Sequence, residues 1–199
     1  MSTNTSANNK YNVREFIAFT GAKVLQDKTS VFVGTGLPMI AAILAQKTHA
    51  PQLLIIFEAG GVGPILPELP ISVGQGLTYY RGVAAGSMHN VMSICQAGYI
   101  DVGFLGAAQV DMYGNINTTC IGDHEHPSVR LPGSGGASDI GSLSHKTIII
   151  VAGQSKRTFV NKLDFLTTPG YLDGPGARER AGLPSRSGPY RVITQLGVF

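Results

Sequence analysis

The sequence predicts an α/β fold in which an open, mostly parallel sheet is flanked by helices. Short apolar runs rich in β-branched residues recur along the chain, and continuous runs of this kind are typical of strands buried on both faces of a parallel sheet. Segments with apolar residues at helical spacing alternate with these runs, as they do in βαβ units. Glycine-rich loops join one segment to the next.

The first half of the chain opens with a strand–turn–helix unit. Residues 12–27 carry a loose helical pattern, and the β-branched run at 30–33 predicts a short strand. That strand leads through Gly34-Thr35-Gly36 into an apolar helix over residues 39–48, as at the opening of a βαβ unit. The run LLIIF at 53–57 predicts a second strand that is buried on both faces.

The rest of the chain repeats this alternation with longer loops. The loop from Gly63 to Gly76 is too long for a simple turn, so we expect it to be functional or poorly ordered. Gly114 and Asn115 mark a turn. The remaining expected elements, in chain order, are a helix over residues 91–97, a strand over 102–105, a short helix from Ser138, a strand over 147–152 and a strand over 190–194.

Length and composition indicate a single folded domain. The chain has 199 residues, of which 43% are hydrophobic and 14% charged, which is enough apolar material for one sizeable core. The polar residues 1–10 predict a disordered tail, so we expect one domain over residues 11–199. The low share of charged residues fits a large core and a partner-covered surface equally well.

Charge and cysteine content narrow the function classes. Lys and Arg exceed Asp and Glu by 15 − 12 = 3, and the densest basic cluster is only Arg178 with Arg180, so we predict no nucleic-acid partner. No stretch is long enough to span a bilayer and the N-terminus has no signal-peptide core, so we expect a cytoplasmic protein that does not bind membranes. Cys95 and Cys120 lack metal-ligand spacing, and we expect both to be reduced and buried.

Glu58 is the most informative polar residue. It follows the apolar run 53–57 directly, and the carboxyl ends of strands are where open α/β sheets bind ligands. A carboxylate there is partly desolvated, which makes it a better nucleophile toward an activated acyl group. Gly60 and Gly61 follow, so a bulky substrate could approach the backbone. The alternative is a carboxylate that caps a helix or accepts loop N–H groups.

Two glycine loops offer backbone N–H groups. The loop PGSGGA places Gly133, Gly135 and Gly136 before the helix expected from Ser138, where free N–H groups could bind a phosphate or a developing oxyanion. A tight turn with close helix–sheet packing is the other interpretation. The loop with Gly34 and Gly36 lacks the third glycine of a dinucleotide fingerprint and the Lys-Ser/Thr of a P-loop.

Other polar residues fit structural roles. Gln109 and Asp111 flank the turn after the strand expected at residues 102–105, and we expect them to order it through hydrogen bonds to its N–H groups. His124 and His126 lie two residues apart, which would bring them to one face of a strand. No further ligand cluster accompanies them, so we predict no metal site.

Four segments together resemble one family. The strings VGTGLP, GAAQVDMYGNINTTCIGDHEHP, PGSGGASDI and KRTFVNKLDFLTTPGYLDGPGARERAGLP are similar to segments of the beta subunit of class I coenzyme A transferases of the glutaconate type. The resemblance extends from about Phe16 to the C-terminus. It implies the CoA-transferase form of the open α/β fold.

The resemblance also implies a mechanism. In the family, a glutamate after a core strand attacks an acyl-CoA and carries CoA as a glutamyl thioester, and Glu58 stands at that position. The family's Ser or Asn neighbour is Ala59 here, so a side-chain hydrogen bond from that position is absent. The loop Gly133, Gly135, Gly136 and Ala137 matches the family's GxGGA segment, which lines the site. Further candidates for substrate-binding loops are Gly34, Gly36, Gly60, Gly61 and Gln109.

Partners and alternatives follow from the same resemblance. The family pairs alpha and beta subunits with the site between them, so we expect an α2β2 hetero-oligomer. Coenzyme A is then a substrate, there is no permanently bound cofactor, and the acyl group is a glutaconyl-like dicarboxylate. Some relatives instead hydrolyse ring-opened acyl-CoA, and others decarboxylate but lack the glutamate that this chain keeps as Glu58. A non-catalytic subunit of the same fold is a further alternative.

Overall fold

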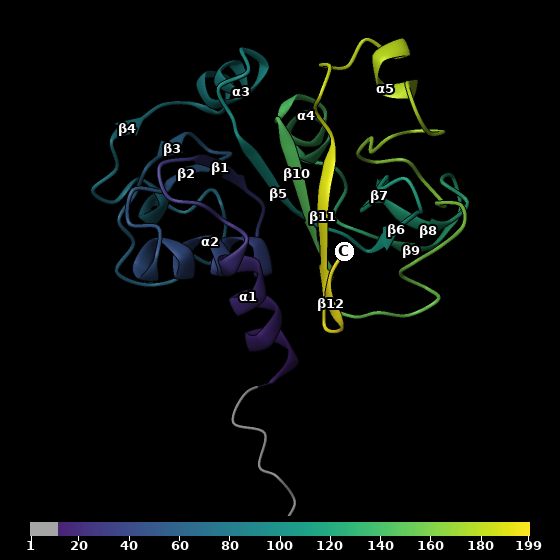
Figure 1. Cartoon of the computed structure of the whole chain (residues 1–199), viewed down its shortest axis with the longest axis horizontal. Helices are drawn as coiled ribbons and strands as arrows, with labels where there is room; N and C mark the ends of the chain where they lie inside the picture. Colours follow the sequence, from purple (N-terminus) through teal and green to yellow (C-terminus); the bar gives the residue numbers. More distant parts are fainter. Residues whose placement is uncertain (1–11) are drawn as a thin grey trace, which may run out of the picture.

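A computed structural model describes residues 12–199, and the tail expected to be disordered at residues 1–10 lies outside them. An eight-stranded sheet forms the centre, in the order β12-β11-β10-β5-β1-β2-β3-β4 (Figure 1). Its five central strands are parallel, and the short strands at both edges are antiparallel. The strands are β1 (Ser30–Val33), β2 (Leu54–Phe57), β3 (Gly61–Val62), β4 (Ala84–Ala85), β5 (Val102–Gly106), β10 (Lys146–Ile150), β11 (Pro189–Thr194) and β12 (Gly197–Val198).

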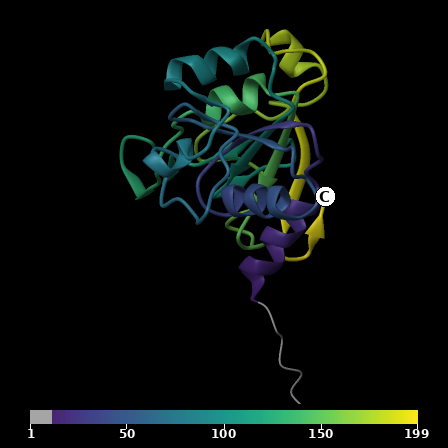
Figure 2. The same cartoon turned by 90° about the vertical axis from the view of Figure 1, so that its left-hand side faces the viewer.

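Helices cover both faces of this sheet, which confirms the predicted α/β class with an open, mostly parallel sheet. Figure 2 shows α1 and α2 on one side of the strands and α3 and α4 on the other. The helices are α1 (Val13–Lys23), α2 (Leu37–Thr48), α3 (Met88–Gln96), α4 (Ala137–Leu143), α5 (Ala177–Arg180) and the 3-10 helix η1 (Gly76–Tyr79). Two small antiparallel sheets pair β6 (Gln109–Val110) with β7 (Ile116–Asn117) and β8 (Cys120–Gly122) with β9 (Pro127–Arg130).

The apolar runs are continuous because both faces of each central strand are buried. Phe32 and Ile56 pack with α3 and α4 on one face, whereas their neighbours Val33 and Phe57 pack with α1 and α2 on the other. Burying one such side chain contributes about 1.5–3 kcal/mol. Cys95 belongs to this interior, and both cysteines are free and buried as predicted.

Side-chain caps set the starts of two helices. Asn12 and Glu15 form a capping box at α1, with both hydrogen bonds at 2.9 Å. Ser87 caps α3 in the same way, so that helix begins at Met88 rather than at residue 91. A side-chain N-cap contributes about 1 kcal/mol. The predicted helix over residues 12–27 is too long, because α1 ends at Lys23.

The long loop after β3 is ordered by its own contacts. Residues 63–86 contain η1 and β4, and β4 pairs with β3. Gln46 donates to the carbonyl of Pro64 at 3.2 Å, and Ile65 N–H donates to Tyr80 O at 3.1 Å. Of the two expectations for this loop, poor order is therefore wrong.

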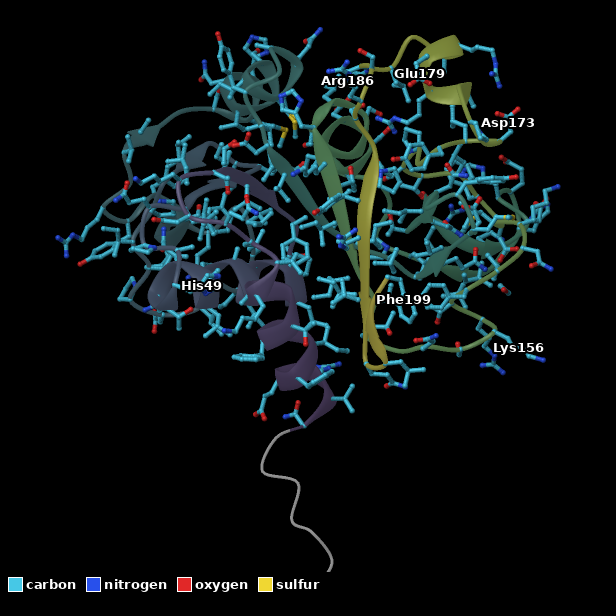
Figure 3. The ribbon with its side chains drawn as sticks, in the orientation of Figure 1. His49, Lys156, Asp173, Glu179, Arg186 and Phe199 are labelled. Atoms are coloured by element: carbon cyan, nitrogen blue, oxygen red, sulfur yellow. The ribbon has the colours of Figure 1, made fainter. Side chains whose placement is uncertain are left out.

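A buried arginine holds the C-terminal segment around α5 to α4. Arg178 is 1% exposed and donates to four carbonyl oxygens and to Ser187 Oγ, at 2.8–3.3 Å. It is thus an internal support rather than half of a basic surface cluster with Arg180. Phe199, labelled in Figure 3, exchanges two backbone hydrogen bonds of 2.9 Å with Val192. Among residues 12–199, no helix is long and apolar enough to cross a membrane.

Candidate active site

Glu58 sits at the tip of a tight turn between β2 and β3. The N–H of Gly60 donates to the carbonyl of Phe57 at 2.9 Å, so Glu58 and Ala59 are the two central residues of that turn. Glu58 is half-buried. A residue at this place is fixed by the strand behind it while its carboxylate stays accessible from one side.

Among residues 12–199, the carboxylate has one hydrogen-bond partner, which comes from the start of α4. The N–H of Gly136 donates to Glu58 Oε1 at 2.9 Å, across 78 positions of sequence. A Cβ atom at Gly136 would lie 3.1 Å from Oε1 and 2.3 Å from the terminal methyl of Met92. Glycine at this position therefore allows the loop backbone to approach the carboxylate closely.

Two N–H groups of the same loop have no protein acceptor within the described residues. The N–H of Gly133 donates to Thr118 O and that of Ala137 donates to Ser134 O, each at 2.8 Å. With the N–H of Gly136 bound to Glu58, only those of Ser134 and Gly135 remain without an acceptor. Both residues are exposed, so these groups can serve a ligand beside the carboxylate.

Thr118 holds the glycine loop at Gly133, its N-terminal end, and we call this pair of contacts the clamp. Its carbonyl accepts from the N–H of Gly133, and its hydroxyl donates back to the carbonyl of Gly133 at 2.9 Å. The N–H of Thr118 donates to Thr167 Oγ1 at 2.9 Å. The loop geometry is thus set by polar contacts with the segment between β7 and β8.

A cavity of about 450 Å³ opens beside Glu58. Its polar side chains are Thr35, Glu58, Thr118 and Ser134, and no lysine, arginine or histidine among the described residues lines it. The walls are mostly apolar groups and glycines. The apolar and glycine lining consists of Val33, Gly34, Val73, Leu105, Gly106, Ala107, Ala108, Leu131, Pro132, Gly133, Gly135, Ala137 and Ile140.

The structure brings together part of the set that the sequence suggested. Gly34, Gly133, Gly135 and Ala137 line the cavity with Glu58, and Gly136 contacts the carboxylate.

The structure around Gly60 and Gly61 does not match the expectation that a substrate approaches their backbone. Both are buried. A Cβ on Gly60 would lie 2.2 Å from Gly86 O, and one on Gly61 would lie 2.1 Å from Thr78 O. These glycines therefore allow close packing of backbone on backbone, and neither lines the Glu58 cavity.

Gly36 and Gln109 also lie outside the cavity lining. Gly36 precedes α2 with φ of +78° and borders a different hollow, beside α1. Gln109 is buried, accepts from Asn117 at 2.8 Å and donates to Asp164 at 2.9 Å. Its amide therefore ties β6 to β7 and to the later segment.

The remaining polar residues make local contacts. Asp111 Oδ1 accepts from the N–H of Tyr113 at 2.9 Å and of Asn115 at 3.0 Å, which orders the predicted turn. His124 lies 3.0 Å from Glu125 and stacks on Phe165. Within residues 12–199, no group of three His, Cys, Asp or Glu side chains could hold a metal ion.

Sequence reasoning missed Thr118 and Met92. Thr118 lies between two short strands, β7 and β8, and such short strands carry no periodic signal that would place a side chain. Met92 lies one turn into α3, and only the packing of α3 on α4 brings its methyl group toward Gly136. Both contacts depend on tertiary packing.

Comparisons with known proteins agree on one family. The family model "Coenzyme A transferase" matches residues 15–199. The chain is 45% identical over 192 residues to the B subunit of 3-oxoadipate CoA-transferase from Pseudomonas knackmussii, covering 95% of this chain and 72% of that one.

The names of two further relatives state a different substrate or a different reaction. The B subunit of glutaconate CoA-transferase from Acidaminococcus fermentans is 41% identical over 196 residues, with coverage of 95% and 72%. The crystal structure of that enzyme matches with a TM-score of 0.87 over 95% of this chain and 74% of that one. The cholesterol ring-cleaving hydrolase IpdB subunit of Mycobacterium tuberculosis is 27% identical over 202 residues, with coverage of 93% and 71%.

Proposed function

Since this chain belongs to the coenzyme A transferase family, as a subunit of the B type, we propose that Glu58 carries CoA between two carboxylates as a glutamyl thioester. The observation that supports this proposal is the position of its carboxylate. It accepts from Gly136 N–H at 2.9 Å and faces a cavity beside two N–H groups that have no acceptor in the described part of the chain.

The exchange consists of two reversible steps. A Glu58 oxygen attacks the thioester carbonyl of the donor acyl-CoA, the carbon–sulfur bond breaks, and CoA leaves as a thiolate from a mixed anhydride. The thiolate then attacks the glutamyl carbonyl, which forms a glutamyl thioester and releases the donor acid as a carboxylate. The acceptor carboxylate reverses both steps and leaves as its CoA ester. The bonds broken and formed are of similar energy, so a covalent carrier suffices.

Backbone amides supply the charge stabilisation in this proposal. Each step passes through a tetrahedral oxyanion, which preorganised N–H groups stabilise. The N–H groups of Ser134 and Gly135 are available for it, because those of Gly133 and Ala137 are already bonded to carbonyls. Gly136 N–H meanwhile orients the carboxylate through its bond to Oε1.

The substrate proposal is a dicarboxylic acyl group, of the glutaconyl or 3-oxoadipyl kind. The names of the relatives that are 41% and 45% identical to this chain support it. The cavity in this chain has no cationic lining among the described residues, so we propose that the alpha-type partner of the complex binds the distal carboxylate. An α2β2 assembly and a cytoplasmic location stay predictions.

Hydrolysis is the second candidate activity. The 27% identity to a ring-cleaving hydrolase subunit favours it, and water attack on the same glutamyl thioester would produce free CoA. A transferase and a hydrolase therefore share the covalent intermediate and differ in what resolves it.

The test is an intact-mass measurement on the complex with the alpha-type partner. Glutaconyl-CoA or 3-oxoadipyl-CoA is added without an acceptor, and we expect a mass gain of one CoA on this chain. Glu58→Gln should abolish the gain, whereas Glu68→Gln, which alters an exposed glutamate of the next loop, should retain it. Adduct formation with transfer to added acetate supports the transferase. Adduct formation with free CoA and no transfer supports the hydrolase, and absence of any adduct contradicts the role of Glu58.

A further inference from the structure

The turn that carries Glu58 receives a hydrogen bond from a tyrosine of the following loop. Tyr79 is the last residue of η1, and its hydroxyl donates to the carbonyl oxygen of Ala59 at 2.5 Å. Ala59 directly follows Glu58 in the turn. Within the described residues, this is the one side-chain hydrogen bond to the backbone of residues 57–61.

The same loop packs against the turn at two more points. Gly86 N–H donates to the carbonyl of Gly60 at 2.9 Å. The Cα of Gly60 faces Gly86 O and that of Gly61 faces Thr78 O, so closely that neither position has room for a side chain. The backbone of the turn is thus packed closely against residues 78–86.

Tyr79 is held in place by the loop itself. Thr78, its neighbour in η1, is fully buried and donates to the carbonyl of Gln75 at 2.7 Å. The N–H of Ile71 donates to the Gln75 side chain at 2.6 Å. The phenol is therefore presented to Ala59 by an anchored segment, and its own side chain does not line the Glu58 cavity.

We propose that Tyr79 is a positioning residue for Glu58, an inference that rests on the proposed role of Glu58 as nucleophile. The hydroxyl fixes the peptide between Ala59 and Gly60, and that peptide determines how the turn presents the carboxylate to Gly136 N–H. Alanine at position 59 has no polar side chain with which to hold the turn, and the Tyr79 hydroxyl supplies a bond from outside it.

The proposal predicts a specific kinetic signature. Tyr79→Phe keeps the ring and its packing and removes the hydroxyl alone. The freed peptide lets the carboxylate turn away from Gly136, so loading of Glu58 slows while substrate binding in the cavity is unchanged. We expect kcat to fall about three- to tenfold, the range for one lost hydrogen bond, with KM within about twofold of wild type.

Tyr80→Phe is the matched control. Tyr80 is adjacent, 48% exposed, and its hydroxyl makes no hydrogen bond within the described chain. In the complex with the alpha-type partner, rapid quenching of the glutaconyl-CoA reaction followed by intact mass gives the rate at which this chain gains CoA. Thermal melts of both variants measure the structural contribution separately.

The outcomes separate the two proposals. The positioning role is supported if the wild-type chain forms the CoA adduct, Tyr79→Phe forms it several-fold more slowly, and Tyr80→Phe forms it at the wild-type rate. If the wild-type chain and Tyr79→Phe form the adduct equally fast, the positioning role is overturned and Glu58 stays the nucleophile. This holds even if Tyr79→Phe melts at a lower temperature. No adduct on the wild-type chain overturns the nucleophile and the positioning role together.

Discussion

Substituting Gly136 by alanine tests whether the N–H group at that position aims the carboxylate of Glu58. The backbone of Gly136 has φ of −82° and ψ of 2°, a conformation open to alanine, so the backbone itself is not strained. The added methyl group would lie 3.1 Å from Glu58 Oε1 and 2.3 Å from the methyl group of Met92. Met92 ends in a flexible thioether that can rotate away. The carboxylate can move only by lengthening its 2.9 Å bond to the N–H.

The size of the effect follows from that bond. A hydrogen bond to a charged group contributes about 1.5–3 kcal/mol, and each 1.4 kcal/mol corresponds to about tenfold. We therefore expect Gly136→Ala to lower kcat/KM for CoA exchange by roughly ten- to a hundredfold in the complex with the alpha-type partner, with little change in melting temperature. Gly153→Ala is the control, since a Cβ there meets nothing within 4 Å and its φ is not positive.

A double variant distinguishes the two contacts. If the loss comes from Glu58, then Met92→Ala combined with Gly136→Ala remains as slow as Gly136→Ala alone. Recovery of activity in the double variant would show that the crowded Met92 methyl group displaced α3 or α4, and the reasoning about the carboxylate would be refuted. Unchanged activity in Gly136→Ala would refute it more directly.

Three further outcomes are expected. Thr118→Val removes the hydroxyl donor to Gly133 O and should slow exchange by about three- to tenfold, whereas Thr118→Ser should not; equal rates would contradict the clamp. Arg178→Met leaves five acceptors without this donor, three of them in buried hydrogen bonds and two in partly buried ones. It should lower the free energy of unfolding in urea by about 3 kcal/mol or more, while the exposed Arg180→Met stays within about 0.5 kcal/mol. Burial raises the pKa of the Cys95 thiol, a rise that its contact with Ser144 partly offsets. The contribution of the neutral thiol to stability is thus complete below the unfolded pKa of about 8.5 and is lost as pH rises through the folded pKa. Urea titrations above about pH 9 should therefore show a fall in the free energy of unfolding that Cys95→Ala lacks.

Local patterns in the sequence were sufficient to predict strands of the parallel core. The run at residues 30–33 is β1 without any shift, and the run at 53–57 ends with β2 at Phe57. Such strands are buried on both faces, so their apolar signal is continuous. Glu58 follows directly, and its position at a strand end was therefore readable from the sequence.

The edges of the sheet and the supports of the site carried no comparable signal. β3 and β4 have two residues each, too few to show alternation. Arg178 belongs to a charged string that reads as surface, yet the carbonyls that surround it, among them those of Gly170 and Ser142, come from separate segments. The same holds for Thr118 and Tyr79, whose partners are set by tertiary packing rather than by neighbours in sequence.

The bond between Gly136 and Glu58 also has a consequence for the order of folding. Its two ends are 78 positions apart, and closing a loop of that length is entropically costly and tends to come late. During synthesis from the N-terminus, Glu58 emerges long before the amide that orients it. The nascent chain therefore holds an unaligned carboxylate. We expect reactivity toward thioesters to arise only when α4 has docked on β5 and β10. The onset of adduct formation would then report the time at which folding is complete.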